Sequence, residues 1–276
     1  MTRRAEILSR LEAKRAGGNA IIGAGAGTGI SAKFLHDGGA DLIFIYNSGR
    51  FRMQGLSSWA GHLPFGDANG IVMEMGEREI MPIAPEADVV AGVCGVDPTR
   101  RMSHFLPKIV EAGFAGVINY PTVAVIDGRM RADLEAGELG FEKEVAMIAI
   151  AHALGLLTTA YVCAPEEARA MVDAGADMIV AHMGLTRGGA IGAVHPLAMA
   201  DAAKDVAAIA EASRARRKHV FVLAHGGPIA TPADAAELFR LVEVDGFLGA
   251  SSMERLPIEE PLRGTTFAFT QLRTRT

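Results

Sequence analysis

Cysteine and long hydrophobic stretches are scarce in this chain. The 276 residues include only Cys94 and Cys163, too few for a disulfide framework or a structural zinc site built from cysteine. The longest uncharged stretches, such as residues 17–32, are broken by Gly, Thr and Ser and end before the roughly 18 residues that a membrane span requires. The charged amino-terminal segment lacks the apolar core of a secretory signal. We therefore expect a soluble, cytoplasmic globular protein without a membrane partner.

Positive charge is also limited. The formal net charge is -5 and no basic tract occurs, which argues against a nucleic-acid partner. All six lysines fall in predicted helices or at their edges: Lys14, Lys33, Lys108, Lys143, Lys204 and Lys218. A Schiff-base aldolase needs a lysine that projects from a strand into the active site. The sequence therefore excludes that mechanism.

Short β-branched runs flanked by glycine are abundant. The chain has 32 glycines, and many of them stand just before or after such a run. The runs are continuously apolar and do not alternate, which is typical of parallel strands covered on both faces. Eight of them can be identified: Asn19–Gly23, Asp41–Tyr46, Asp88–Cys94, Ala115–Tyr120, Leu156–Val162, Asp177–His182, His219–His225 and Asp245–Ala250.

Segments of helical period lie between the runs. Arg101–Gly113 and Phe141–Gly155 each end on a glycine that predicts a helix C-cap. Thr231 followed by Pro232 predicts an N-cap and a first helical turn. A weak repeat of helix end, glycine and next strand recurs at residues 36–43, 110–118 and 172–179.

This alternation predicts a (β/α)8 TIM barrel, formed as a single domain over residues 1–276. A doubly wound open sheet is the alternative. The segment Gly23–Gly29 superficially resembles a dinucleotide fingerprint. No acidic residue ends the second predicted strand, where the ribose of a nicotinamide cofactor would need one. We therefore reject the nicotinamide interpretation.

Polar residues gather at the carboxyl ends of the predicted strands, whereas the strand starts carry mostly a lone Asp or Asn. Catalytic groups of TIM barrels occupy the carboxyl ends. We therefore expect a site there for a small carboxylate or phosphate substrate. The candidates are Gly25, Thr28, Tyr46, Asn47, Ser48, Arg50, Asp97, Asn119, Tyr161, His182, His225 and Ser251.

His182 and His225 end neighbouring predicted strands, whose backbones should lie about 4.8 Å apart. Their imidazoles could share a metal or act as a general acid and base. The alternative for each is a core histidine that is hydrogen-bonded to the backbone.

Glycine-rich turns follow the seventh and eighth predicted strands, at residues 224–228 and 249–252. Bare backbone amides in such turns can approach an anion closely. Gly226, Gly227, Ser251 and Ser252 are therefore candidate anion-binding residues. The alternative is that these glycines only permit tight turns.

Three long segments, residues 47–67, 121–140 and 183–196, are predicted to be binding loops or lids. The first contains Arg50 and Arg52, which suit bidentate contacts with a carboxylate or phosphate. It also contains Trp59 and several other large apolar side chains. These must pack on the barrel mouth or against another subunit, so a homo-oligomer is expected.

Five segments of this sequence resemble the phosphoenolpyruvate hydrolase-like family, whose members are also described as TIM-barrel signal-transduction proteins or phosphonopyruvate hydrolases. The similarity runs over nearly the whole chain. It implies a TIM barrel of the phosphoenolpyruvate-binding kind and hydrolysis of a C–O or C–P bond in a three-carbon phosphorylated acid. The matching segments are residues 47–69, 91–98, 181–186, 225–229 and 249–257.

The wider phosphoenolpyruvate mutase and isocitrate lyase group has a similar Gly-Leu-Ser and Asp-x-Asn in its second-strand loop. The resemblance implies that Ser57 binds substrate and that Asp67 and Asn69 act at the reaction centre. That group places acidic magnesium ligands on strands three and four. Here Asp97 comes one turn late and Asn119 replaces a carboxylate. The sequence therefore leaves open whether the site binds a divalent metal, Mg²⁺ or Zn²⁺.

The sequence thus predicts a hydrolase or lyase acting on a small phosphorylated or phosphono keto acid. Arg50, His182 or a metal would stabilise the enolate, and His225 or Asp67 would move protons. One alternative is a metal-assisted carbon–carbon lyase built on the two histidines. The other is a non-catalytic, effector-sensing barrel in signal transduction.

Overall fold

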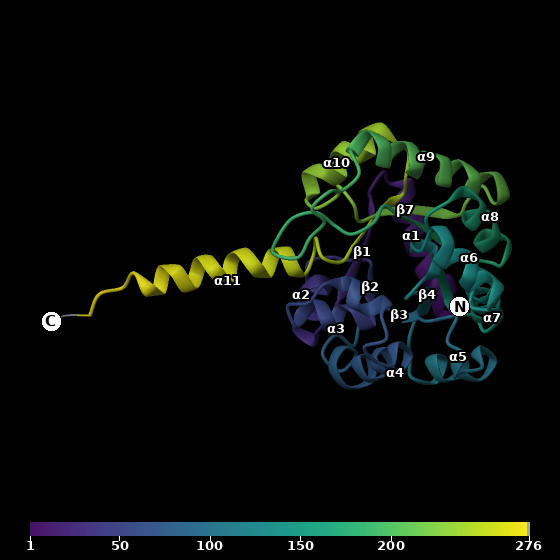
Figure 1. Ribbon diagram of the computed structural model, residues 1–276, viewed down its shortest axis with the longest axis horizontal. Helices are drawn as coiled ribbons and strands as arrows, with labels where there is room; N and C mark the ends of the chain where they lie inside the picture. The colour runs from purple at the N-terminus through teal and green to yellow at the C-terminus, as the bar shows by residue number, and fades with distance from the viewer. Residues whose placement is uncertain (275–276) are drawn as a thin grey trace.

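Eight parallel strands close into a barrel in the order in which they occur in the chain (Figure 1). The computed structural model describes residues 1–274. Hydrogen bonds between the first and last strands, with Ile22 opposite Phe247, complete the ring. The TIM-barrel prediction is confirmed, and the open-sheet alternative is wrong. The strands are β1 Ile21–Ala26, β2 Leu42–Ile45, β3 Val89–Val93, β4 Gly116–Asn119, β5 Leu157–Val162, β6 Met178–His182, β7 Phe221–His225 and β8 Gly246–Gly249.

Helices surround the barrel, except that the last one projects away from it (Figure 1). The helices are α1 Arg3–Ala16, α2 Gly29–Asp37, α3 Asn47–Met53, α4 Ala68–Glu74, α5 Met102–Glu111, α6 Gly128–Ala136, α7 Phe141–Ala153, α8 Pro165–Asp173, α9 Met199–Arg216, α10 Pro232–Leu241 and α11 Arg255–Thr270. Short 3-10 and π segments add η1 Ser58–His62, η2 Met75–Ile80 and η3 Val123–Val125.

The predicted helix ends are confirmed. Gly113 and Gly155 adopt φ values of 92° and 79°, the left-handed conformation that glycine allows after a helix. The Thr231 hydroxyl accepts the amide of Asp234, and the Asp234 carboxylate accepts the amide of Thr231 in return. This reciprocal pair fixes the start of α10.

Two of the three predicted loops are largely helical. Residues 47–67 contain α3 and η1, and residues 121–140 contain η3 and α6. The loop prediction is wrong for these segments. Their apolar side chains are unevenly spaced, so the sequence shows no clear helical period and does not indicate the short helices. Residues 183–196 have no helix, and only Arg187 and Ala193 form an isolated bridge.

Hydrophobic packing fills two regions. The larger lies between the outward faces of the strands and the surrounding helices. The smaller fills the interior of the barrel, where Phe44, Leu157 and Leu223 meet Ile7 and Leu11 from α1. Because α1 closes the amino-terminal end of the barrel, the interior can be entered only at the carboxyl ends of the strands.

Aspartates at the strand starts tie neighbouring strands together. The carboxylates of Asp41, Asp177 and Asp245 accept the backbone amides of Ile22, Thr158 and Val222 at 2.7, 3.0 and 2.7 Å. All three also meet cations of α1, in Lys14–Asp41, Arg4–Asp177 and Arg15–Asp245. The lone acidic residues that precede the predicted strands therefore have a structural role.

No helix within residues 1–274 combines the length and apolar character needed to cross a bilayer.

We predict that Asp177→Ala lowers the free energy of unfolding by about 2–4 kcal/mol, because it removes strand contacts and leaves the Arg4 cation without its partner. Urea denaturation would measure the loss. Asp173→Ala is the control, since Asp173 pairs with Arg216 at the surface, and its effect should stay below about 1 kcal/mol. Equal losses in the two variants would contradict the assigned role.

Candidate functional site

A small cavity opens at the carboxyl ends of the strands. Its volume of about 40 Å³ accommodates only a few water molecules. Of the predicted site residues, seven line it: Tyr46, Ser48, Arg52, Tyr161, His182, His225 and Ser251. The remaining lining residues are Ser58, Trp59, His62, Tyr120, Gly184, Leu185, Thr186 and Ala250.

Aromatic rings form the floor of this cavity. The hydroxyls of Tyr46 and Tyr161 are 2.9 Å apart and hydrogen-bonded. The ring of Tyr161 packs against His182 and His225, with ring centres 5.1 and 5.0 Å away. Trp59 and His62, from η1, approach from above and line the same space. The histidines are therefore held between tyrosines below and the η1 segment above.

His182 and His225 lie side by side, as predicted. They are register partners at the ends of β6 and β7, and their ring centres are 4.8 Å apart. Both side chains are buried. The strand register alone therefore brings the two imidazoles together.

The hydrogen bonds of the two imidazoles assign opposite tautomers. The amide of Gly184 donates to Nδ1 of His182 at 3.1 Å, so the proton of a neutral His182 is on Nε2. The carbonyl of Leu248 lies 2.7 Å from Nδ1 of His225. A carbonyl only accepts, so Nδ1 of His225 carries the proton and its Nε2 has the free lone pair.

Neither Nε2 atom has a protein partner among the hydrogen bonds of residues 1–274, and both residues line the cavity. The cavity wall thus presents one N–H donor, from His182, beside one nitrogen acceptor, from His225. This is the arrangement that a general acid and a general base require.

Burial keeps all three histidines of the cavity uncharged. It lowers the pKa of His225 to about 4 and that of His182 well below its ordinary value. The neighbouring His225 opposes a charge on His182 further. Burial also lowers the pKa of His62 to about 4. At neutral pH each imidazole therefore has one protonated ring nitrogen and one ring nitrogen with a lone pair.

One fully buried ion pair supplies the charged groups of the cavity. Nε and Nη2 of Arg52 donate to one oxygen of Glu254 at 2.8 and 2.5 Å. The other Glu254 oxygen accepts the amide of Gly27 at 2.6 Å. The two side chains are 1% and 0% exposed. Nη1 of Arg52 takes part in no hydrogen bond within residues 1–274, so it is available to a ligand in the cavity.

Arg50 is directed elsewhere. Its guanidinium pairs with Glu74 and Glu79 at 2.8 and 2.5 Å, and it does not line the cavity. Residues two apart on a helix point in different directions, whereas residues four apart share a face. In α3, Arg52 therefore shares a face with Ser48, and Arg50 does not. The structure therefore does not bring Arg50 to the cavity, and Arg52 lies there instead.

Asp67 and Asn47 line a wider cleft of about 930 Å³, which His62 separates from the cavity. The Asp67 carboxylate caps α4 through the amide of Gly70 at 2.9 Å and forms an ion pair with Arg100. This ion pair lowers the pKa of Asp67. The structure therefore does not bring Asp67 to the two histidines.

Several other predicted site residues have structural contacts instead. Asn69 bridges the backbone of Cys94 and the carboxylate of Asp97. Thr28 and Ser57 accept backbone amides at the starts of α2 and η1. Asn119 joins β4 to β5 through the backbone of Tyr161. The carbonyl of Gly25 accepts from Arg52 at 3.4 Å.

The glycine-rich turns contribute less than predicted. Gly226 and Gly227 have φ values of 75° and 57°, and a Cβ at either position would lie within 2.4 Å of a backbone oxygen. The amide of Gly227 already donates to Gly184. Ser252 faces a separate groove. Only Ser251 of these four faces the cavity, and its amide takes part in no hydrogen bond within residues 1–274.

Comparison with known proteins identifies the family. Residues 6–272 match the family described as phosphoenolpyruvate hydrolase-like. The chain belongs to this family. The ToMV resistance protein Tm-1 of Solanum lycopersicum is 52% identical over 266 residues, which are 96% of this chain and 35% of that protein. The chain therefore spans about a third of this relative's length.

Solved structures confirm the TIM-barrel fold of this member of the phosphoenolpyruvate hydrolase-like family. 2,3-Dimethylmalate lyase, a member of the PEP mutase/isocitrate lyase superfamily, matches with a TM-score of 0.62 and 15% identity, covering 98% of this chain and 88% of that one. Phosphonopyruvate hydrolase in complex with oxalate and Mg²⁺ matches with a TM-score of 0.60 and 15% identity, covering 98% and 88%. At this identity the likeness shows the fold alone.

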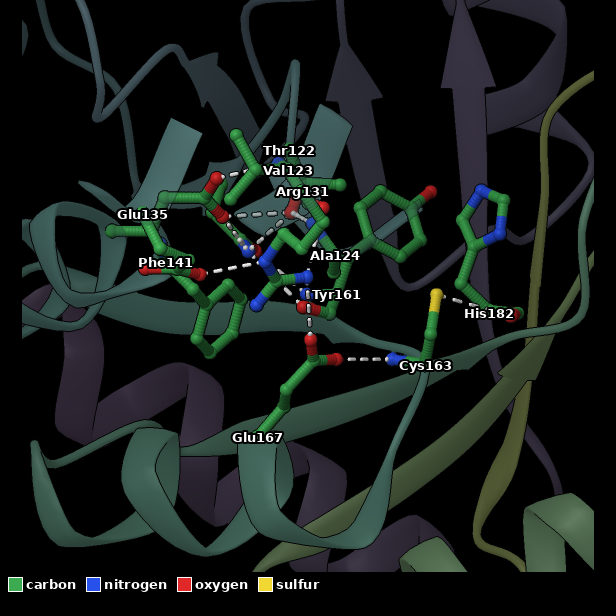
Figure 2. A network of polar contacts seen from close by, with 12 residues as sticks. Thr122, Val123, Ala124, Arg131, Glu135, Phe141, Tyr161, Cys163, Glu167 and His182 are labelled. Carbon is green, nitrogen blue, oxygen red and sulfur yellow. Dashed lines mark hydrogen bonds and ion pairs between the residues drawn. The ribbon is translucent and has the colours of Figure 1, made fainter. Parts of the chain in front are cut away.

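A polar network reaches the backbone carbonyl of His182 (Figure 2). Glu167 accepts the amide of Cys163 at 2.8 Å and pairs with Arg131 at 3.1 Å. The thiol of Cys163 donates to the carbonyl of His182 at 3.6 Å. The network therefore links α6, α8 and the end of β6, and it fixes the backbone from which His182 projects (Figure 2).

Glu144 is a buried carboxyl that the sequence analysis did not identify. It accepts hydrogen bonds from Asn119, Thr122 and the amide of Val123 at 2.6–2.7 Å. Burial raises its pKa to about 7. Its position in the first turn of α7 gave no signal, because acidic residues are common at helix starts.

The donor set does not fit a divalent metal. Within residues 1–274, no three His, Cys, Asp or Glu side chains are grouped so that they could hold one. Glu254 and Glu144 are already engaged by Arg52 and by three hydrogen-bond donors. Mg²⁺ requires several free oxygen ligands, and a Zn²⁺ site requires a third protein ligand beside the two histidines.

We predict that Arg52→Met lowers the free energy of unfolding by about 3–5 kcal/mol, because it leaves the Glu254 carboxylate buried without its counter-charge. The double variant Arg52→Met/Glu254→Leu should recover most of the loss, since it removes both charges. Arg50→Met is the control, and it should cost less than about 1 kcal/mol because Arg50 pairs near the surface. Chemical denaturation would measure all three, and a double variant as unstable as the single one would refute the charge argument.

We also predict that the buried histidines destabilise the fold in mild acid. The pKa values of these histidines are lower in the folded state than in the unfolded chain. Between about pH 6.5 and pH 4 the unfolded chain therefore binds more protons than the folded protein, and the free energy of unfolding decreases as the pH is lowered. His225→Gln should reduce the loss of stability between pH 7 and pH 5, measured by urea denaturation. The wild type and His225→Gln must be compared, because Glu144 has a raised pKa and therefore increases the free energy of unfolding as the pH is lowered. This contribution is the same in both proteins. An unchanged pH dependence in His225→Gln would contradict the prediction.

Proposed function

We propose that this protein is a hydrolase or lyase that acts on a small phosphorylated or phosphono keto acid, such as phosphoenolpyruvate or phosphonopyruvate, through the enolate of pyruvate. One observation carries the proposal: two neutral imidazoles of opposite tautomer open onto one cavity beside a buried arginine. The family name and the shared barrel support the same reaction class.

In the phosphono acid reaction, water attacks phosphorus and the C–P bond breaks. Nε2 of His225 takes a proton from that water, and the electron pair of the broken bond moves onto the keto acid as its enolate. The N–H of His182 and Nη1 of Arg52 donate to the enolate oxygen. Protonation at C3 then gives pyruvate and phosphate. The residues thus act where charge develops, in a cavity with room for only a few water molecules.

The phosphoryl group would be held by neutral donors. Ser251 offers a hydroxyl and a free amide, and Ser48 and Thr186 add hydroxyls to the same wall. The cavity as it stands holds only a few waters. Binding of a keto acid therefore requires Trp59 and His62, on η1, to withdraw from the mouth.

The low net charge of the cavity favours a second candidate. This is a carbon–carbon lyase that acts on a small carboxylic acid without a phosphoryl group. Glu254 neutralises Arg52, the histidines are uncharged, and no lysine lines the cavity. A substrate with several negative charges would be buried there at an electrostatic cost, whereas a single carboxylate could be met by Nη1 of Arg52. His225 would then remove the proton of a 3-hydroxyl group as the C2–C3 bond breaks. The hydroxyl-bearing carbon becomes a carbonyl, and the electron pair of the bond stays on C2 as the enolate of the carboxylate.

Product release decides between the two candidates. Purified protein would be incubated with phosphonopyruvate, phosphoenolpyruvate and a panel of small 3-hydroxy acids that carry one or two carboxylates, with and without added Mg²⁺. Release of phosphate together with pyruvate is expected under the first proposal. Cleavage of the hydroxy acids without phosphate chemistry would support the second. Ligand-induced thermal stabilisation with no turnover of any substrate would identify a sensor and refute both.

Substitutions test the assigned roles. We expect His225→Gln and His182→Gln each to lower kcat by at least about 100-fold, because each removes a proton-transfer or donor group. His219→Gln is the matched control, since His219 is exposed at the opposite end of the barrel, just before β7, and it should retain full activity. Steady-state kinetics on the substrate found above would measure the effects. A fully active His225→Gln variant would contradict the mechanism.

A further inference from the structure

The cleft beside the cavity is wide enough for a much larger ligand than a three-carbon acid. Its volume of about 930 Å³ lies at the upper end of the range for sites that enclose drug-sized molecules, about 300–1,000 Å³. The cavity at the two histidines measures about 40 Å³. His62 lines both spaces and separates them. The cleft and the cavity are therefore neighbours divided by one side chain.

Apolar side chains form much of the cleft wall. Met130 and Leu134 are four residues apart and share a face of α6. Met130 is 61% exposed, and Leu63, which follows η1, is 54% exposed. As a whole, α6 buries none of its residues. Further apolar lining comes from Val96, Ile126 and Leu139. The cleft therefore brings together apolar surface that the chain leaves in contact with solvent.

Polar contacts fix α6 beside the cleft (Figure 2). Arg131 donates to the carbonyl of Val123 at 2.9 Å. Its guanidinium also pairs with Glu135 at 2.6 Å and with Glu167 of α8 at 3.1 Å. Because Arg131 follows Met130 directly, these contacts hold the apolar face of α6 in place. The cleft is therefore a formed part of the structure, which lowers the entropic cost of binding a ligand there.

The charges in the cleft do not favour an anion. Among the described residues, the charged ones that line it are Asp67, Asp97 and Arg100. Arg100 pairs with Asp97 at 2.7 Å and also with Asp67. Two carboxylates with one guanidinium leave an excess negative charge, which repels a carboxylate or a phosphate group. The cleft therefore suits an uncharged group.

The imidazole between the two spaces has one nitrogen without a partner. Nδ1 of His62 lies 3.3 Å from the hydroxyl of Tyr120. Nε2 of His62 is buried and has no hydrogen-bond partner within residues 1–274. Buried polar atoms are normally hydrogen-bonded. A ligand that extends from the cavity into the cleft would supply a partner for Nε2.

We infer that the substrate is an acid that carries an uncharged, apolar chain of several carbons, and that this chain lies in the cleft against Met130 and Leu134. The inference rests on the proposed function and specifies its substrate class. The acid group binds in the cavity at Arg52 and the two histidines. The chain is attached to C3, which is the atom bonded to phosphorus in a phosphono acid and the hydroxyl-bearing atom in a 3-hydroxy acid. Withdrawal of η1, which admits the acid group, also joins the cavity to the cleft.

Calorimetric titration of the full-length chain with 2-oxo acids tests the inference without requiring turnover. The series runs from pyruvate through 2-oxobutanoate and 2-oxohexanoate to 2-oxooctanoate, so the chain grows while the acid group stays the same. We expect Kd to fall about threefold for each added CH2 group, because each group leaves water for an apolar surface. The diacid of the same length as 2-oxooctanoate should gain no affinity over pyruvate, since its second carboxylate meets the negative charge of the cleft.

Substitutions in the cleft wall locate the chain. Leu63→Glu/Met130→Glu places two charges there and should weaken the binding of 2-oxooctanoate at least about tenfold, while Kd for pyruvate stays unchanged. Both side chains are exposed in the wild type, so the barrel should fold normally, as circular dichroism would show. Leu241→Glu is the matched control, because Leu241 is 55% exposed on α10 and does not line the cleft. This variant should keep the full dependence on chain length.

Three outcomes would contradict the inference. Binding of pyruvate and of the longer acids with equal affinity would overturn it and leave the proposed function intact. A gain with chain length that persists in Leu63→Glu/Met130→Glu would also overturn it, because the chain would then bind elsewhere. Failure of every 2-oxo acid to bind would refute the inference together with the acid-binding site of the proposed function.

Discussion

Closure of the sheet between β1 and β8 is the constraint on which the rest of this structure depends. It brings the carboxyl ends of all eight strands into one ring, while α1 fills the opposite end. Residues that are far apart in the chain, such as Arg52 and Glu254, then meet inside the ring. Without closure the imidazoles of β6 and β7 would still be neighbours, but they would not face a shared cavity.

The chemistry of the mouth follows from its exclusion of water. Burial keeps the histidines uncharged and lets single backbone contacts choose their tautomers. It also makes a lone arginine costly, so Arg52 is found with Glu254. The result is a site that offers directed donors and an acceptor with almost no net charge. Such a site suits a reaction in which a proton moves and charge appears only briefly.

Much of the fold and part of the site could be predicted from the sequence. Eight apolar runs between helical segments were enough for the barrel, and the ends of β6 and β7 were enough for the His182–His225 pair. Arg52 was named beside Arg50 as a residue suited to anion contacts, but the enolate role was given to Arg50 because α3 was not recognised as a helix. Its spacing of four from Ser48 could have indicated a shared face. Glu144 could not be found, because its distance from Asn119 in the chain does not show that the two side chains meet.

The sequence by itself determined the number, order and approximate position of the strands, since a run covered on both faces must be apolar whatever its neighbours are. It also determined which residues stand at the strand ends. The tertiary structure alone decided which of those side chains face the cavity, because a turn or a short helix rotates each one after its strand ends. Arg50 and Arg52 are two residues apart and differ for that reason. Arg50 forms ion pairs near the surface, whereas Arg52 is buried beside the two histidines.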